Sequence, residues 1–104
     1  MYKINFFVPE NAAEVVKAAM FAVGAGKIGN YEQCSFETFG TGQFKPLLGA
    51  KPFIGTIGEV LKVKELKVEI VCDDHCLKNV ILAMKAYHPY EMPAYDIIQL
   101  IDFS

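Results

Sequence analysis

The sequence predicts an α+β fold, a ferredoxin-like two-layer sandwich in which two helices cover one face of a four-stranded antiparallel sheet in the order βαββαβ. Three observations predict it. Apolar side chains alternate with polar ones in three stretches, within residues 2–8, 31–39 and 64–72, which is the period of a half-buried strand. Two other stretches repeat apolar side chains with the 3.6-residue period of a helix. The chain has 104 residues, enough for one domain, which we expect to span residues 1–104.

The first strand and the first helix are predicted from residues 2–24. Apolar and polar side chains alternate over residues 2–8, and Pro9 closes this strand. Asn11, followed three residues later by Glu14, is typical of a capping box that begins a helix. The apolar stripe of this helix comprises Val15, Val16, Ala19, Met20 and Val23. The helix is expected to stop at the glycines that begin with Gly24.

Two further strands are expected in the middle of the chain. We place one over residues 31–39 and the other over residues 64–72. In the second of these, Leu66 and its alternate neighbours face the core, whereas Glu65 and its alternate neighbours face solvent. Such alternation is typical of antiparallel sheets that bury only one face.

The last helix and the last strand follow an acidic pair. Asp73 or Asp74 is expected to cap the helix, and Pro89 ends it near His88. The helix has apolar side chains at the i, i+3, i+4 and i+7 positions, namely Leu77, Val80, Ile81 and Met84. The final strand is predicted over residues 95–101.

One long stretch, about residues 40–58, does not belong to the minimal fold. It carries five glycines and two Lys-Pro steps, which disfavour a helix. A disordered linker is one interpretation, but linkers are poor in large apolar residues and this stretch has six. We therefore predict an ordered arm that packs on its own domain or on a neighbouring subunit. The predicted interface residues are Phe44, Leu47, Phe53 and Ile54.

Charge and cysteine content exclude several function classes. All ten basic residues are lysines, so the bidentate arginine contacts common in nucleic-acid recognition are absent. We expect no nucleic-acid partner. No apolar run is long enough to span a bilayer, so we expect no membrane partner. The chain has three cysteines, an odd number that cannot form a closed disulfide framework. We therefore expect the protein to reside in the reducing cytoplasm.

Two motifs resemble ligand sites but have simpler structural interpretations. Residues 24–29 have the letters G-x-G-x-x-G, yet they end a helix and do not begin one, as a dinucleotide loop would. Residues 72–76 bring two cysteines and a histidine together, a possible zinc or copper site. Their spacing is not that of a zinc motif, and a buried cysteine plus an acidic cap explains the same residues.

The most specific candidate site is His88-Pro89-Tyr90-Glu91. Imidazole and carboxylate on either side of a proline turn are able to hold a divalent metal ion or a small ligand, with Tyr90 beside them. The alternative is a structural turn fixed by prolines. No nucleophile is paired with a base in the sequence, so we identify no catalytic residue and expect no enzyme.

These segments resemble a known family. The run from Gly24 to Phe36, the Gly40-Thr41-Gly42-Gln43-Phe44 segment and the residues from His88 to Asp96 resemble the middle domain of the NIF-three-like proteins of the YqfO type. The His88–Pro93 piece also resembles CutA, the divalent-cation-tolerance family. CutA and the PII signalling proteins share the ferredoxin-like fold and are trimeric. The two-metal site of full-length NIF-three-like proteins lies in flanking domains, so the resemblance implies no hydrolase activity here.

The combined prediction is a non-enzymatic homo-oligomer, with a trimer favoured. It would act as a binding or regulatory module for a divalent metal ion or small ligand at subunit edges, through His88, Tyr90 and Glu91. One alternative is a protein-interaction module whose arm docks a protein partner. The other is an enzyme or an accessory to a metal-dependent hydrolase.

Overall fold

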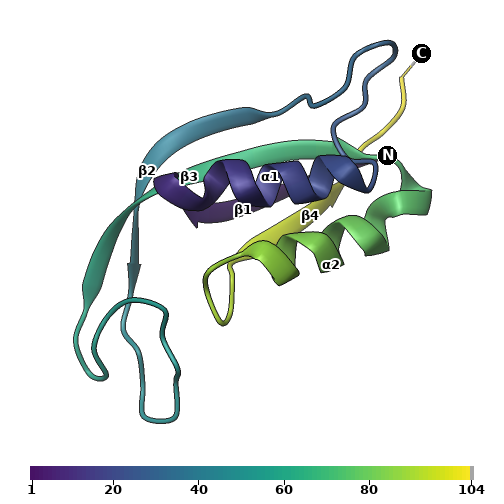
Figure 1. The fold of residues 1–104 in the computed structure, drawn as a ribbon. Helices are drawn as coiled ribbons and strands as arrows, with labels where there is room; N and C mark the ends of the chain where they lie inside the picture. The colour runs from purple at the N-terminus through teal and green to yellow at the C-terminus, as the bar shows by residue number, and fades with distance from the viewer. Residues whose placement is uncertain (104) are drawn as a thin grey trace.

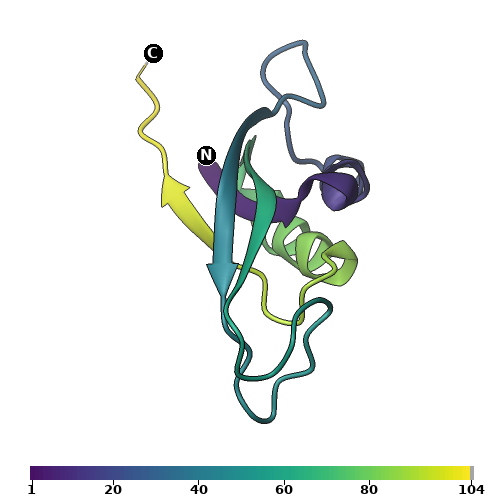
Figure 2. The ribbon, with the colours of Figure 1, turned by 90° about the vertical axis from the view of Figure 1, so that its left-hand side faces the viewer.

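The computed structural model describes residues 1–103 and confirms the predicted α+β sandwich. Two helices lie on the same face of a four-stranded sheet (Figures 1 and 2). The sheet order is β2-β3-β1-β4, and every neighbouring pair is antiparallel. The elements are β1 (Tyr2–Pro9), the 3-10 turn η1 (Glu10–Ala12), α1 (Ala13–Ala22), β2 (Phe36–Phe44), β3 (Leu61–Cys72), the 3-10 turn η2 (Asp74–Cys76), α2 (Leu77–Tyr87) and β4 (Tyr95–Gln99).

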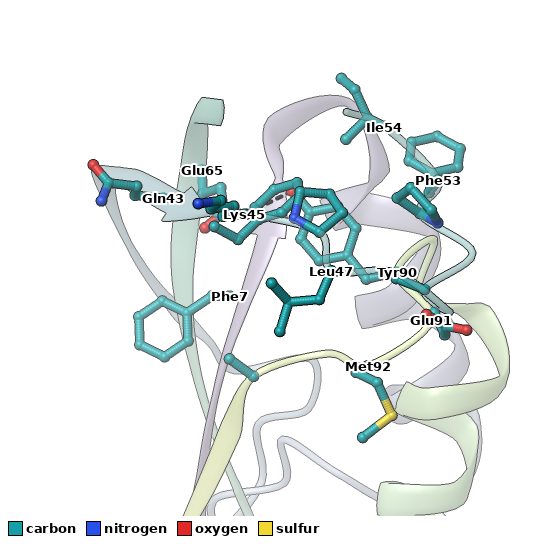
Figure 3. Close-up of a pocket in the computed structure, with 15 residues that line it drawn as sticks. Phe7, Gln43, Lys45, Leu47, Phe53, Ile54, Glu65, Tyr90, Glu91 and Met92 are labelled. Carbon is teal, nitrogen blue, oxygen red and sulfur yellow. Dashed lines mark hydrogen bonds between the residues drawn. The ribbon is translucent and has the colours of Figure 1, made fainter. Parts of the chain in front are cut away.

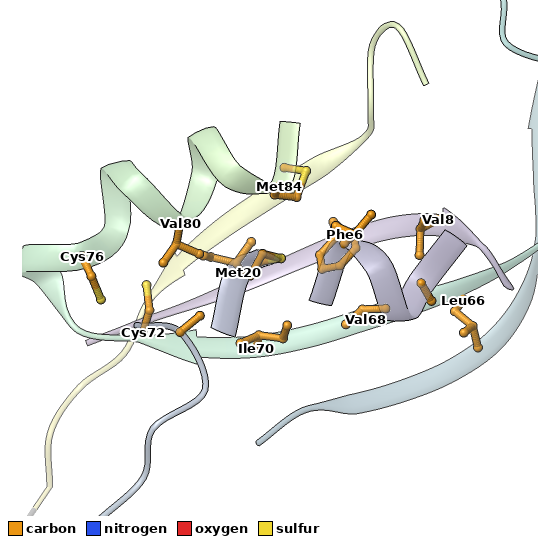
Figure 4. Close-up of a cluster of buried hydrophobic side chains, with 14 residues drawn as sticks. Phe6, Val8, Met20, Leu66, Val68, Ile70, Cys72, Cys76, Val80 and Met84 are labelled. Atoms are coloured by element: carbon orange, nitrogen blue, oxygen red, sulfur yellow. The ribbon is translucent and has the colours of Figure 1, made fainter. Parts of the chain in front are cut away.

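The core lies between the sheet and the two helices (Figure 4). Alternate residues of the two central strands point into it, with Phe6 of β1 opposite Val68 of β3. Met20 of α1 and Met84 of α2 cover them from the helix layer. Each large apolar side chain buried in this way contributes about 1.5–3 kcal/mol to the free energy of folding, which holds the sheet and helices in register.

The helix boundaries differ in detail from the prediction. No side-chain hydrogen bond caps either helix in the described chain, so the expected caps at Asn11 and at the Asp73–Asp74 pair were wrong. A 3-10 turn precedes each helix and leads the backbone into it instead. The predicted stripe of α1 was also partly wrong, because Val15 is 57% exposed. Ala13 occupies the buried face in its place.

The second strand begins and ends later than predicted. A bridge between Ile28 and Tyr31 closes a turn at residues 29–30, and the backbone is irregular from there to residue 35. Gln33 has a positive φ of 58°, which lies outside the strand region. β2 therefore starts at Phe36. It continues through Gly42, since this segment pairs with the start of β3. The first residues of the predicted arm, 40–44, therefore belong to β2.

The β2–β3 hairpin extends beyond the rest of the sheet. β1 pairs with β3 only from Glu65 onward, whereas β2 follows β3 back to Leu61. The arm is therefore residues 45–60, and it projects from the end of this hairpin (Figure 1). β3 begins three residues earlier than predicted and β4 ends at Gln99, two residues short of its predicted end.

Neither helix in residues 1–103 is long and apolar enough to cross a membrane.

Candidate ligand-binding pocket

A pocket of about 440 Å³ lies between the arm and the turn that follows α2 (Figure 3). This volume is within the range of small-molecule sites. Its lining is predominantly apolar and combines the sheet, the arm and the turn. The lining residues are Phe7, Gln43, Phe44, Lys45, Pro46, Leu47, Ala50, Pro52, Phe53, Ile54, Glu65, Tyr90, Glu91, Met92 and Ala94.

The structure brings together two regions that the sequence indicated separately. Tyr90 and Glu91 of the predicted site line the pocket. All four predicted interface residues of the arm, Phe44, Leu47, Phe53 and Ile54, line it as well. His88 is not among the lining residues, but its ring lies 5.0 Å from that of Tyr90, between centroids. The arm and the proline turn thus form one site.

His88 is buried and both of its ring nitrogens are engaged. Nε2 lies 2.7 Å from the carbonyl oxygen of Phe7, so this nitrogen must donate. Nδ1 accepts a 3.0 Å hydrogen bond from the backbone N–H of Tyr90. Only a neutral imidazole protonated at Nε2 satisfies both contacts. Burial accordingly lowers the pKa of His88.

These contacts support the structural-turn interpretation of His88. They join the end of α2 to β1 and to the turn. A metal ion on His88 would have to replace one of the two hydrogen bonds. The metal site on His88 and Glu91 therefore stays a prediction. It requires that one of these two hydrogen bonds of His88 be broken.

Tyr90 is the polar centre of the pocket. Its hydroxyl donates a 2.6 Å hydrogen bond to Oε2 of Glu65 on β3. Its ring packs against Phe44 with a centroid distance of 5.8 Å and an interplanar angle of 60°. Burial and the neighbouring Glu65 carboxylate raise the pKa of Tyr90, so the phenol stays protonated and acts as a donor.

Glu65 is the site residue that sequence reasoning missed. The alternation of β3 predicted a solvated side chain, yet Glu65 is only 8% exposed. The signal in the sequence was Gly42 on the neighbouring strand. A Cβ at Gly42 would overlap the Glu65 carboxylate, whereas a Cβ at Gly40, which pairs with Glu65, would meet nothing. The absence of a side chain at Gly42 leaves the space in which the carboxylate lies.

Glu91 connects the turn to the arm. Its Oε1 accepts a 3.2 Å hydrogen bond from the backbone N–H of Lys51. A second contact closes the base of the arm, where Gly58 N–H donates to the carbonyl of Pro46 at 2.8 Å. These two hydrogen bonds tie the arm to the turn and close its base, and the order of the arm stays a prediction.

The cysteine pair lies away from this pocket, in the core. Cys72 continues the inward face of β3, as predicted, and burial raises its pKa to about 11. The Cys76 thiol donates to the carbonyl oxygen of Asp73 at 3.3 Å, whereas His75 is exposed. Residues 1–103 contain no group of three or more His, Cys, Asp or Glu side chains arranged to hold a metal ion.

Comparison with known proteins identifies the family resemblance. No family model matches the chain. A GTP cyclohydrolase 1 type 2 homolog of Bacillus subtilis is 50% identical over 95 residues, which are 91% of this chain and 26% of that protein. The corresponding Mycobacterium tuberculosis protein is 47% identical, over 91% of this chain and 25% of its own length. A Bacillus cereus protein related to NIF3 superimposes with a TM-score of 0.82 at 39% identity, over 97% of this chain and 26% of that one.

The chain is similar in sequence to a segment of these relatives and of the NIF3-related protein. This confirms the resemblance predicted from the sequence. The chain spans about a quarter of the length of the curated relatives it matches. It also superimposes on CutA1 from Pyrococcus horikoshii with a TM-score of 0.70 at 17% identity, over all of this chain and 87% of that one. That second likeness shows the shared fold.

Proposed function

We propose that this protein is a non-enzymatic, homo-oligomeric binding or regulatory module of the cytoplasm. In this proposal the pocket between arm and turn holds a small ligand, and the subunits assemble as a trimer. The observation that carries it is the convergence of the arm and the His88–Glu91 turn on one pocket of ligand size.

The chemistry of the pocket favours binding over catalysis. Tyr90 is held protonated, and the nearby His88 has both nitrogens occupied. Neither is poised to transfer a proton to or from a substrate. A ligand would instead meet an apolar wall with a few fixed polar groups, the usual composition of a binding site.

The oligomer is supported by the apolar surface of the arm. Leu48 is 94% exposed, Leu47 is 69% exposed and Phe53 is 65% exposed. A cluster of large apolar side chains on a small domain is typical of a subunit or partner interface. Because Leu47 and Phe53 also line the pocket, assembly of copies through the arm would place the pocket at a subunit edge.

Ligand binding is tested by titrating the purified protein with divalent metal ions, nucleotides, and small organic amines and acids. The measurements are the melting temperature and the ¹H–¹⁵N shifts of the Lys51 and Tyr90 amides, which donate hydrogen bonds to Glu91 and His88 beside the pocket. A ligand of the pocket raises the melting temperature, because it binds only the native state, and moves these two amides. A panel that leaves both amides unmoved, together with a protein partner bound through the arm, would establish the protein-interaction alternative.

The same experiment separates a metal from an organic ligand. One structural neighbour is the divalent cation tolerance protein CutA1 of Thermus thermophilus, and the curated relatives are GTP cyclohydrolase 1 type 2 homologs. A metal ion bound to His88 releases either the Tyr90 amide or the Phe7 carbonyl. A shift that requires His88 assigns a metal site, whereas a shift that survives His88→Gln assigns an organic ligand to the pocket.

A further inference from the structure

We infer that the pocket selects small organic cations, namely amines or amidines with an apolar body, through the buried carboxylate of Glu65. The inference rests on the proposed function, since it names the ligand class of the same pocket. It is carried by the burial, the partners and the surroundings of one side chain.

Glu65 carries a charge without a compensating cation. Its side chain is more than nine-tenths buried, yet no ion pair to it forms among residues 1–103. Its one side-chain partner is the Tyr90 hydroxyl, on Oε2. A buried carboxylate is favourable only when it is paired or fully hydrogen-bonded. Oε1, to which no side chain or backbone N–H of the described residues donates, retains acceptor capacity for a ligand N–H.

Aromatic residues share this pocket with Glu65. Phe7, Phe44 and Tyr90 line the same pocket as Glu65. The faces of aromatic rings attract ammonium and guanidinium groups, and the attraction strengthens when water is excluded. Phe53 and Leu47 on the arm offer an apolar wall for the rest of such a ligand (Figure 3).

The remaining charged groups of the pocket decide between a cation and an anion. Glu91 adds a second carboxylate, and Lys45 adds one ammonium group. Lys45 is exposed and therefore well solvated, whereas Glu65 is buried. Electrostatic attraction is stronger at the buried charge because water screens it less. A cationic ligand is thus favoured over an anionic one.

Three probes of nearly equal shape test the inference: phenethylamine, 2-phenylethanol and 3-phenylpropionate, which are cationic, neutral and anionic at pH 7. Binding is followed by the ¹H–¹⁵N shifts of the Lys51 and Tyr90 amides of the wild-type protein. Phenethylamine should bind with a Kd at least about tenfold lower than that of either other probe, the effect of one hydrogen bond to a charged partner. The preference should persist in about 0.5 M salt, which screens attraction by exposed charges.

Glu65→Gln provides the matched variant, because it removes the charge and keeps the shape and the acceptor for Tyr90. It should raise the Kd of phenethylamine about tenfold or more and leave that of 2-phenylethanol unchanged. Glu59→Gln, an exposed arm residue outside the pocket lining, makes the same change in net charge and should leave both constants unchanged.

The outcomes distinguish the inference from the proposed function. If 2-phenylethanol or 3-phenylpropionate binds as tightly as phenethylamine, the pocket binds small molecules but the amine selectivity is wrong. Equal loss of phenethylamine binding in both Gln variants would assign the preference to net charge and reject the role of Glu65. If none of the probes moves either amide, amine selectivity is rejected, and the proposed pocket is then judged by the wider ligand panel.

Discussion

The Tyr90 hydroxyl donates a 2.6 Å hydrogen bond to Oε2 of Glu65, across 25 positions of the chain. This contact joins the turn after α2 to the long strand β3. It also fixes the ring of Tyr90 against Phe44, at the point where β2 gives way to the arm. One polar contact therefore positions the sheet, the turn and the base of the arm around the pocket.

The first prediction concerns this contact. Tyr90→Phe should lower the free energy of unfolding by about 1–3 kcal/mol, because it leaves a buried carboxylate without its donor. Tyr87→Phe is the matched control, since Tyr87 is 58% exposed, and it should change stability by less than about 0.5 kcal/mol. Urea denaturation measures both. Equal stability of the two variants would show that solvent replaces the Tyr90 hydroxyl.

A second prediction compares two glycines of β2. Gly42→Ala should displace the Glu65 carboxylate and destabilise the protein by about 1–3 kcal/mol, since the new methyl group overlaps that carboxylate. Gly40→Ala has open space around its Cβ and should be neutral or slightly stabilising. In a Tyr90→Phe background the effect of Gly42→Ala should shrink, because both changes act on the same hydrogen bond. Strict additivity would contradict this coupling.

The third prediction is a loss of stability on mild acidification. The pKa of His88 is lowered in the folded protein, so the unfolded chain takes up the proton first as the pH falls. The contribution of neutral His88 to the free energy of unfolding is therefore complete above the ordinary histidine pKa of 6.5. This contribution is lost as the pH falls below that value. The free energy of unfolding should therefore fall by at most about 1.4 kcal/mol for each pH unit.

Denaturation between about pH 7.5 and pH 5.5 measures this dependence. His88→Gln should be less stable at pH 7.5 but should show a flatter profile. His75→Asn removes the other histidine, which is exposed, and should keep the wild-type profile. A wild-type slope that survives His88→Gln would assign the titration to another group.

A fourth prediction concerns assembly. Light scattering on a size-exclusion peak should give about three times the chain mass at micromolar concentration, if copies bury the apolar side of the arm. Phe53→Ala should weaken the oligomer more than Lys51→Ala does, because exposed aromatic side chains dominate interface energies. Amides of residues 43–57 should be protected from hydrogen exchange in the oligomer. A monomeric peak, or exchange as fast as in an unfolded peptide, would falsify the interface.

The fold was predictable because its signals are local. Alternation along β1 and β3 and the helical spacing in α2 report directly which side chains face the core, such as Phe6, Val68 and Val80. The start of β2 was not predictable in this way, because its apolar residues Phe36 and Phe39 are exposed. Only its antiparallel pairing with β3 shows where β2 begins.

The pocket was predictable only in part. The proline turn and the apolar arm stand out in the sequence, so Tyr90 and Phe53 were found. The role of Glu65 depends on a tyrosine 25 positions away and on space left by Gly42 across the sheet. A pattern within one strand cannot report a contact that a neighbouring strand and a distant turn create together.

The pairing of Phe44 with Leu61 closes the sheet just below the arm. Since the two ends of residues 45–60 are held side by side by this ladder, the length and composition of the arm can change without shifting any strand register. Loop-closure entropy grows only slowly with length, so a longer or shorter replacement adds little to the free energy of folding. The sandwich therefore tolerates exchange of the arm, and replacing this one insert is expected to change the lining of the pocket while the fold stays the same.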